Sequence, residues 1–520
     1  MRRIATISSL AALLLVLALP AAAESLKGTV KLGVITKDED TSDVTAIQET
    51  VNIHDGFSVT QVALRGALGG GSAFRLDLEE MNLDSRRGYF NYRLQDRLHL
   101  TARYDRRRHL FDADGAVESE REKWMFGARV TPADWLRITG DYSRQTRQGD
   151  RLGYGAGFQS WLGDAYDYTF GIGRVEAEAR RGARAFAVGF ETSSFEDAQL
   201  TAADRTGQVF SARANLPCLL WPGKLSHYLR GTLGEQKLDQ GGLAYTMSTF
   251  QYVGVARPVR PFQLDYRFFG SRVEDDATGL QTDEVRNDFD LTWHHAHGKV
   301  FGGYGYFTND NERSLTSDNV WRVGTVVGDG KVFKGKVSYA SSEKTDTEGL
   351  TLLKDIEASR LRFSLDVNPD DKMNFGVSYI DHDRTFPVIG VESSGLRYAA
   401  RGGYRLDGLG AFNLTYSYSD DEYQDLAGSF QADNHAVTGR LDIDRFRDLK
   451  LSAGLTYLDI GKDLDIEKSI LMFAGEYALQ DDYFVEVKYN VYNYDDFILM
   501  DRYYTANVVW VNVGYKLSID

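Results

Sequence analysis

Residues 483–491, with the sequence YFVEVKYNV, decide the fold class of this chain. The odd-numbered positions carry Tyr or Val, whereas Glu486, Lys488 and Asn490 alternate with them. A period of two residues predicts a β-strand with one apolar face and one polar face.

The same alternation recurs along the chain, at residues 262–268, 361–367, 412–418 and 449–457. The alternating runs are about 10 to 14 residues long, whereas strands of soluble sandwiches usually have five or six residues. About 9–11 residues cross a bilayer as a tilted strand. The pattern therefore favours transmembrane strands with one face toward lipid and one toward water.

The connections between these strands alternate in length. Short turns rich in Gly, Asp and Pro alternate with longer polar stretches such as 38–56, 146–165 and 420–432, with one short outlier at 82–86. Twelve short turns and thirteen longer connections give about 26 strands, with both termini on the short-turn side. We expect an all-β, antiparallel, up-and-down transmembrane barrel with short periplasmic turns and longer outer loops.

The composition excludes several other classes of protein. The 520 residues are 42% hydrophobic, and the chain contains 51 Gly, 8 Pro and 1 Cys. A bundle of transmembrane helices needs apolar runs of about 20 residues. A single Cys excludes a disulfide scaffold, a thiolate zinc cluster and a self-attached c-type haem. The net charge of −15 gives no electrostatic reason to expect nucleic acid as a partner.

The N-terminus predicts export. Arg2 and Arg3 precede the apolar run 10–19, Pro20 ends this run, and Ala21–Ala23 offer small residues for cleavage. This pattern is typical of a secretory signal peptide. We therefore expect a signal peptide at 1–23, cleavage near Ala23, a barrel formed by 24–520, and a location in the Gram-negative outer membrane.

The width of such a barrel limits its function. With strands about 4.8 Å apart and tilted about 40°, 26 strands enclose a backbone diameter of roughly 50 Å. We expect no plug domain, because the first strand begins near residue 26 and no connection exceeds about 20 residues. A separate polypeptide inside the lumen is the simplest expectation.

The polar phase of the strands identifies candidate lumen residues, which are mixed in sign. Two interpretations of these residues remain open. They form a wet interface with a polypeptide, or they are merely solvated residues of the wall. These candidates are Arg103, Asp105, Arg137, Asp141, Asp265, Arg267, Arg362, Asp366, Arg440, Asp442, Glu486 and Lys488.

The last strand carries a candidate assembly signal. Gly514, Leu517 and Ile519 are spaced in a way that resembles the C-terminal signal read by the barrel-assembly machinery. The usual terminal aromatic residue is absent, and Asp520 follows instead.

Taken over its whole mature length, the chain resembles the porin component of porin–cytochrome electron conduits, the MtrB/PioB-like group. The resemblance rests on size, strand number, turn pattern and the Tyr- and Gly-rich texture. The chain lacks the N-terminal CxxC of the best-known branch, so it would belong to a divergent branch. The resemblance implies a sheath around a periplasmic multihaem cytochrome, contact with an outer-surface cytochrome, and extracellular electron transfer. The haem would belong to the partners and not to this chain.

Two alternatives remain open, namely a diffusion porin or substrate-specific channel, and an outer-membrane enzyme or lipid-translocating barrel. His294, His295 and His297 could form a metal tract, although a solvated rim is the more common reading. Cys218 lies in a short apolar turn, where a small buried residue is the ordinary reading. Because no Ser/His/Asp or paired-carboxylate set can be placed, we expect no enzyme, no catalytic residues, no metal site and no cofactor bound by this chain.

Overall fold

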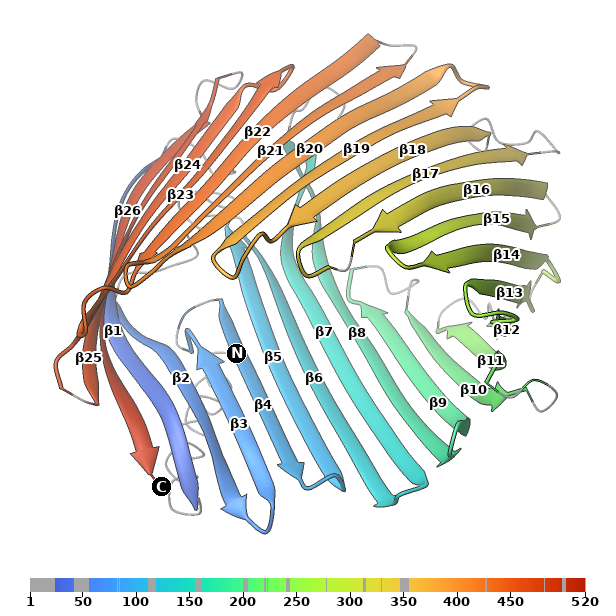
Figure 1. Ribbon diagram of the computed structural model, residues 1–520, viewed down its shortest axis with the longest axis horizontal. Coiled ribbons are helices and arrows are strands. Elements are labelled where there is room, and N and C mark those ends of the chain that lie inside the picture. The colour runs from blue at the N-terminus through green and yellow to red at the C-terminus, as the bar shows by residue number, and fades with distance from the viewer. Residues whose placement is uncertain are drawn as a thin grey trace.

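The computed structural model forms one continuous sheet of 26 strands (Figure 1). It describes residues 24–41, 56–81, 83, 85–110, 118–154, 160–199, 204–218, 221, 223–239, 244–276, 278–311, 315–328, 330–346, 355–425, 428–480, 482–497 and 502–519. The expected signal peptide at 1–23 lies outside these residues. The strands are β1 (Ser25–Thr41), β2 (Gly56–Gly69), β3 (Ser72–Glu79), β4 (Arg86–Leu94), β5 (Leu98–Leu110), β6 (Glu118–Ala133), β7 (Leu136–Tyr154), β8 (Ser160–Arg181), β9 (Arg184–Asp197), β10 (Arg205–Pro217), β11 (Leu225–Leu238), β12 (Ala244–Ala256), β13 (Phe262–Asp275), β14 (Gln281–His295), β15 (Gly298–Asp310), β16 (Leu315–Val327), β17 (Phe333–Asp346), β18 (Ile356–Val367), β19 (Met373–Phe386), β20 (Val391–Leu406), β21 (Gly410–Asp425), β22 (Gly428–Ile443), β23 (Leu449–Lys462), β24 (Ile466–Ala478), β25 (Tyr483–Asp496) and β26 (Arg502–Ile519).

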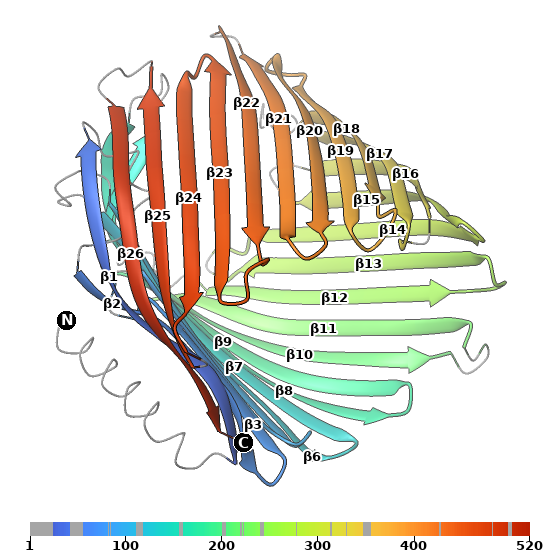
Figure 2. The same ribbon diagram turned by 60° about the vertical axis from the view of Figure 1, so that its left-hand side comes forward.

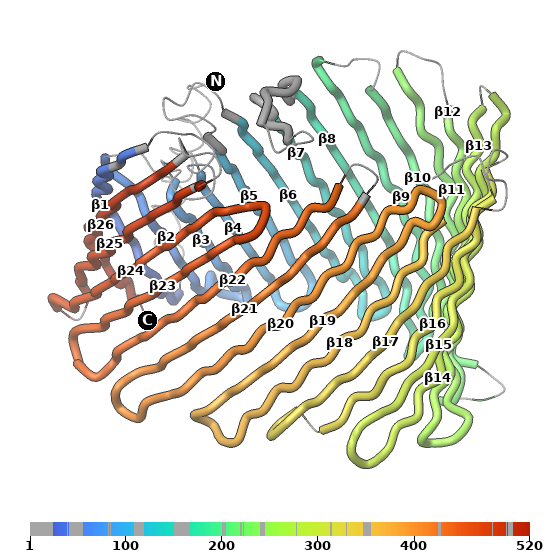
Figure 3. Tube along the Cα trace, turned by 90° about the horizontal axis from the view of Figure 1, so that it is seen from above, coloured from blue at the N-terminus to red at the C-terminus, as the bar shows by residue number. Residues whose placement is uncertain are grey.

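The sheet closes on itself. Each strand pairs antiparallel with the next one along the chain, and β1 pairs with β26 from Leu26–Ile519 to Thr41–Tyr504. The two halves of the chain form facing walls (Figure 3), and the strand direction changes strongly around the wall (Figure 2). The antiparallel barrel and its 26 strands agree with the sequence-based expectation. Among the described residues, no helix is long and apolar enough to cross a membrane.

Some of the connections that are expected to be longer outer loops are shorter than predicted. A loop is expected at 420–432, yet β21 runs to Asp425, β22 begins at Gly428, and these two residues are paired. A second long connection is expected at 146–165, yet Tyr154 of β7 pairs with Ser160 of β8. Backbone N–H and C=O groups can form a ladder whatever the side chains are, so polar segments extend the strands in place of forming loops.

The β3–β4 hairpin is shorter than its neighbours. Glu79, the last residue of β3, pairs with Gln61, so the first residues of β2 extend beyond the hairpin. The connection that follows starts at Glu80, which has a positive φ of 54°. Farther along this connection, Leu83 is only 2% exposed and belongs to an apolar cluster with residues of β1, β25 and β26. The hairpin end is thus packed against the seam at which the barrel closes.

The two phases of the strands differ in chemistry around the barrel. One phase exposes large apolar side chains, such as Phe126, Phe210, Leu233, Trp321 and Val513. The other phase carries ion pairs between strands that are separated by one intervening strand. Such pairs form only where the side chains of these strands converge. Side chains converge on the concave face of a curved sheet, so the charged phase faces the lumen and the apolar phase faces outward.

Candidate functional site: the lumen wall

Strand register places all twelve candidate lumen residues on the charged phase. For example, Asp265 of β13 pairs with Asp290 of β14, which pairs with Gly303 of β15, which in turn pairs with Arg322 of β16. Paired residues lie on the same face of a sheet. The register can be followed in this way from strand to strand around the wall to each predicted position.

The structure does not bring together most of the oppositely charged neighbours within one strand. Of the six such pairs, Arg440–Asp442 and Glu486–Lys488 are in contact, with nitrogen–oxygen distances of 2.9 and 3.3 Å. Several of the other members have partners elsewhere. The contacts between strands are Arg137–Glu178, Arg267–Asp290, Asp366–Arg401 and Asp105–Arg87, and the contacts within a strand are Asp105–Arg107 and Asp265–Gln263.

Three arginines reach across a small residue on the intervening strand. Each row follows the backbone register, with the acid two strands away from the arginine. The rows are Arg213–Ala187–Glu178, Arg322–Gly303–Asp290 and Arg401–Gly376–Asp366. In these rows the carboxylates of Glu178, Asp290 and Asp366 lie 2.7, 3.2 and 2.6 Å from the guanidinium nitrogens. The small middle residue leaves the space through which the guanidinium passes.

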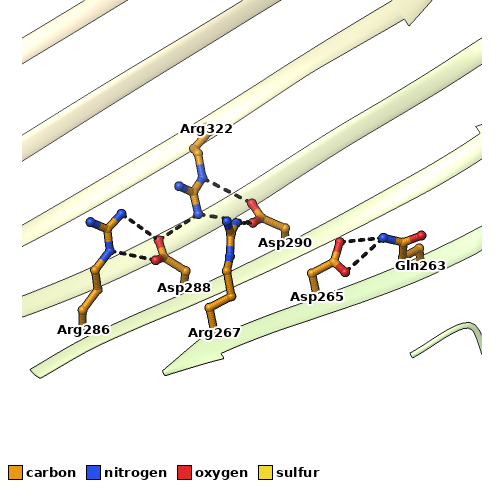
Figure 4. Close-up of polar contacts among 7 residues, drawn as sticks. All are labelled: Gln263, Asp265, Arg267, Arg286, Asp288, Asp290 and Arg322. Atoms are coloured by element: carbon orange, nitrogen blue, oxygen red, sulfur yellow. Dashed lines mark hydrogen bonds and ion pairs between the residues drawn. The ribbon is translucent and has the colours of Figure 1, made fainter. Parts of the chain in front are cut away.

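The largest of these networks lies on β13–β16 (Figure 4). Arg322 contacts Asp288 at 2.9 Å and Asp290 at 3.2 Å, and Asp288 also accepts a hydrogen bond of 2.8 Å from Arg286. Arg267 pairs with Asp290. The side chain of Asp288 is only 8% exposed, so its carboxylate depends on these partners.

Apart from that network, Asp265 accepts two hydrogen bonds from the side-chain amide of Gln263, at 3.0 and 2.9 Å. The seven residues drawn in Figure 4 thus carry three arginines and three aspartates. The positive and negative charges of these seven residues are equal in number, and each of the three arginines contacts an aspartate, so the network is suited to fixing the wall.

The closure seam carries a second buried polar network. Glu486 of β25 accepts hydrogen bonds from Lys31 at 3.1 Å and from the Asn512 amide at 3.0 Å. The Asn512 side chain is fully buried, and its carbonyl oxygen accepts a hydrogen bond from Thr60 at 2.8 Å. One network therefore joins β1, β2, β25 and β26, the first and last strands of the barrel.

The residues of the candidate assembly signal also lie at this seam. Leu517 pairs with Gly28 and Ile519 with Leu26, while Gly514 lies between Lys31 of β1 and Phe484 of β25. A side chain at Gly514 would collide with the Phe484 ring, which is 1% exposed. The ammonium groups of Lys31 and Lys516 lie 5.4 and 5.2 Å from the centre of this ring, within the range of cation–π interactions.

Sequence reasoning missed Arg213, Arg322 and Arg401 and the small residues that they cross, Ala187, Gly303 and Gly376, and it predicts Gly514 only as part of an assembly signal. Gly303, Gly376 and Gly514 occupy the charged phase of long strands, where glycine weakens a strand unless something needs its space. This position is a usable signal for a side chain crossing from the next strand.

Among the described residues outside the strands, Glu80 and Lys372 have altered acidity. Burial raises the pKa of Glu80, and the neighbouring carboxylate of Glu79 adds to this effect, while Arg87 and Lys488 oppose it. The hydrogen bond from Lys372 to Asp407 raises the pKa of the Lys372 ammonium group at an exposed turn.

The histidine tract and the cysteine take ordinary places. The His295 and His297 rings are 6.5 Å apart, and the Nδ1 of His295 accepts a hydrogen bond from the His297 backbone N–H at 3.2 Å. Within the described part of the chain, no group of three or more His, Cys, Asp or Glu side chains is arranged to hold a metal ion. Cys218 is partly buried with a free thiol, and its N–H donates to the Leu225 carbonyl at 2.8 Å.

Comparisons with known proteins give a match of fold. No family model matches the sequence, and no curated protein matches it either. Among solved structures, two variants of the FrpB iron transporter from Neisseria meningitidis match with TM-scores of 0.51 and 0.50 at 10% and 11% identity. Each alignment covers 96% of this chain and 83% of the transporter chain. The siderophore receptor PirA from Pseudomonas aeruginosa aligns with a TM-score of 0.49 at 9% identity, over 95% of this chain and 80% of the receptor.

These matches correct the expected fold class in one further respect. A barrel type without a plug domain is expected from the sequence, but the matching barrels belong to TonB-dependent receptors, which have a plug domain. The expectation fails because the alternating apolar and polar pattern of the wall strands is shared with plugged barrels and does not distinguish the two types. The residues that the structure describes form wall strands and their connections. The chain is therefore similar to the barrel wall of these transporters, and the similarity extends to the fold alone.

Proposed function

We propose that this chain is an outer-membrane barrel that encloses a multihaem c-type cytochrome and holds it as part of an electron conduit to the cell exterior. The family resemblance of the sequence supports a multihaem cytochrome as the partner. The width of the barrel supports the enclosure of that partner. A wall of 26 strands surrounds a lumen of roughly 50 Å between backbones. Wall side chains cannot fill a lumen of that width.

The observation that carries the proposal is the fixed polar wall. Its charges are held by ion pairs that cross whole strands, as in Arg322–Asp290 and Arg401–Asp366. Polar side chains held in place by their neighbours lose little further freedom when a protein surface packs against them, so they favour a stable wet interface.

In this role the chain would insulate the cytochrome from lipid and hold it in position. The haem would belong to the cytochrome. The apolar outward phase would contact lipid, and the charged inward phase would contact the cytochrome. A second cytochrome at the outer surface would receive or deliver the electrons. No catalytic residue is proposed for this chain.

Site-specific cross-linking tests the enclosure. Ala399 and Ala400 are neighbours on β20, where Ala399 pairs with lumen-facing Ser417 and Ala400 pairs with Tyr416 on the outward phase. In a Cys218→Ser background, we expect Ala399→Cys carrying a photoreactive probe to cross-link to a haem-staining protein in native membranes. The matched Ala400→Cys variant should not do so.

Purification from native membranes is a second test of the proposal. We expect the absorbance of c-type haem to co-elute with the barrel in mild detergent. A colourless barrel that elutes alone and gives a large ion conductance in planar bilayers would contradict the proposal. That result would support the alternative, a diffusion porin or substrate-specific channel.

A further inference from the structure

The inner face of β5 and β6 contains a hollow with an excess of positive charge. Its volume is about 210 Å³, and it is lined by Arg103, Asp105, Arg107, Arg121, Lys123 and Met125. The odd-numbered positions of both strands face the lumen, so the long basic side chains converge from two adjacent strands. The hollow thus opens toward the inside of the barrel.

The single carboxylate of the hollow does not neutralise it. Asp105 lies 3.2 Å from Arg107 of its own strand and 3.6 Å from Arg87 of β4. Arg121 is directly opposite Arg107 in the β5–β6 register, and its guanidinium donates to the neutral side chain of Gln145 at 2.7 Å. Like charges directly opposite one another destabilise a sheet, so this arrangement calls for a compensating anion.

The balanced network of Figure 4 provides the contrast. There, Arg267, Arg286 and Arg322 face Asp288 and Asp290 at close range, with Asp265 beside them. On β5–β6, the register sets four cationic side chains around one aspartate. Both regions lie on the lumen phase, but the seven residues of Figure 4 balance in charge, whereas the six residues that line the hollow have four positive charges and one negative charge.

We propose that this hollow is a binding site for oxyanions, namely phosphate, sulfate or carboxylate groups. A guanidinium group presents a planar set of N–H donors that matches such groups and can bind them through two bonds, while a lysine adds a point charge. Arg103, Arg121 and Lys123 supply the donors, and Asp105 orients Arg87 and Arg107 at the edge. The proposal goes beyond the enclosing function, since the site would exist in a sheath or in a channel.

Binding of inorganic pyrophosphate to the purified full chain in detergent tests the site. We expect saturable binding by calorimetry at low ionic strength, and an affinity at least about tenfold weaker in Arg103→Gln/Lys123→Gln. The matched control is Arg440→Gln, which also removes a lumen-facing arginine but one that is already paired with Asp442 at 2.9 Å. The control should bind like the wild type. Equal affinities in all three proteins would overturn the proposal.

A nearly isosteric change at Asp105 separates binding from folding. Asp105→Asn removes the only negative charge of the hollow, so pyrophosphate should bind several-fold more tightly in this variant. Weaker binding in Asp105→Asn, in a variant that keeps the heat-modifiable gel mobility of a folded barrel, would also overturn the proposal.

Two sources could supply the anion, a free solute or the carboxylate groups of an enclosed polypeptide. Repeating the titration on the barrel with its occupant distinguishes them, because an occupant that fills the hollow abolishes pyrophosphate binding and a free solute leaves it intact. Either result is compatible with the site. Co-elution of haem is measured independently, so a failure of the enclosing function is distinguishable from a failure of the site.

Discussion

The Nη2 atom of Arg401 on β20 lies 2.6 Å from the Oδ1 atom of Asp366 on β18, although β19 separates the two strands. The contact crosses Gly376, where a Cβ atom would lie 2.6 Å from the Nε of Arg401 and 2.9 Å from the Asp366 carboxylate. An ion pair of this kind fixes three strands relative to one another. Because such an ion pair needs a residue without a side chain on the intervening strand, a side chain introduced at a glycine of this kind should destabilise the barrel.

Replacing Gly303 by Val should destabilise the barrel by about 1–3 kcal/mol, the cost of forcing extra atoms into a packed site. The new Cβ would collide with the Asp290 carboxylate and lie 2.9 Å from the backbone oxygen of Phe289. Gly302→Val is the matched control on the outward phase, where the nearest atom would be 3.6 Å away. Urea midpoints of the folded barrels in detergent measure the difference. Equal midpoints for the two variants would contradict the role assigned to the glycine.

Removal of Arg322 should be more costly than removal of Arg440. Arg322→Met leaves the nearly buried Asp288 with one arginine partner fewer, for which we expect a loss of about 2 kcal/mol. Arg440→Met breaks a pair whose side chains are 65% and 30% exposed, so the loss should be about 0–1 kcal/mol. The same unfolding assay compares them. A smaller loss for Arg322→Met than for Arg440→Met would show that the Figure 4 network does not stabilise the wall.

The sequence predicts the face of a residue better than its partner. Alternation within one strand is sufficient to assign Arg362 and Asp366 to the polar phase. It does not predict that Asp366 pairs with Arg401, because that contact depends on the stagger of β18, β19 and β20. The ends of the strands cannot be predicted from the sequence for a related reason. Beyond the apolar belt both phases are polar, so a paired strand and a loop have the same composition, as the expected loop at 420–432 illustrates.

At the seam, Gly514→Val should impair closure in the purified protein. The Val side chain would occupy the position of the Phe484 ring, so refolding into detergent should yield less of the heat-modifiable folded form. Phe484→Ala, which removes that ring, should partly rescue Gly514→Val in the double variant. An absence of rescue would mean that the collision is not the cause.

The candidate assembly signal should behave differently from this collision. Leu517 and Ile519 pair with Gly28 and Leu26 near the end of the strand. If the barrel-assembly machinery reads them, Leu517→Ser/Ile519→Ser should lower the amount of barrel in the outer membrane of cells. Spontaneous refolding of the same variant in vitro should remain near the wild-type yield. A parallel loss in both assays would indicate a packing role alone.

The connection after β3 should loosen as the pH rises. Burial and Glu79 raise the pKa of Glu80, so the packed form binds its proton more tightly than the open form. The resulting stabilisation is complete below the ordinary glutamate pKa and is lost as the pH rises through the raised value. In a Cys218→Ser background, Leu83→Cys reports opening through maleimide labelling, normalised to Val388→Cys, an exposed connection residue. We expect the normalised rate to increase with pH and Glu80→Gln to remove this increase. If the two pH profiles coincide, Glu80 does not control how the hairpin end packs against the seam.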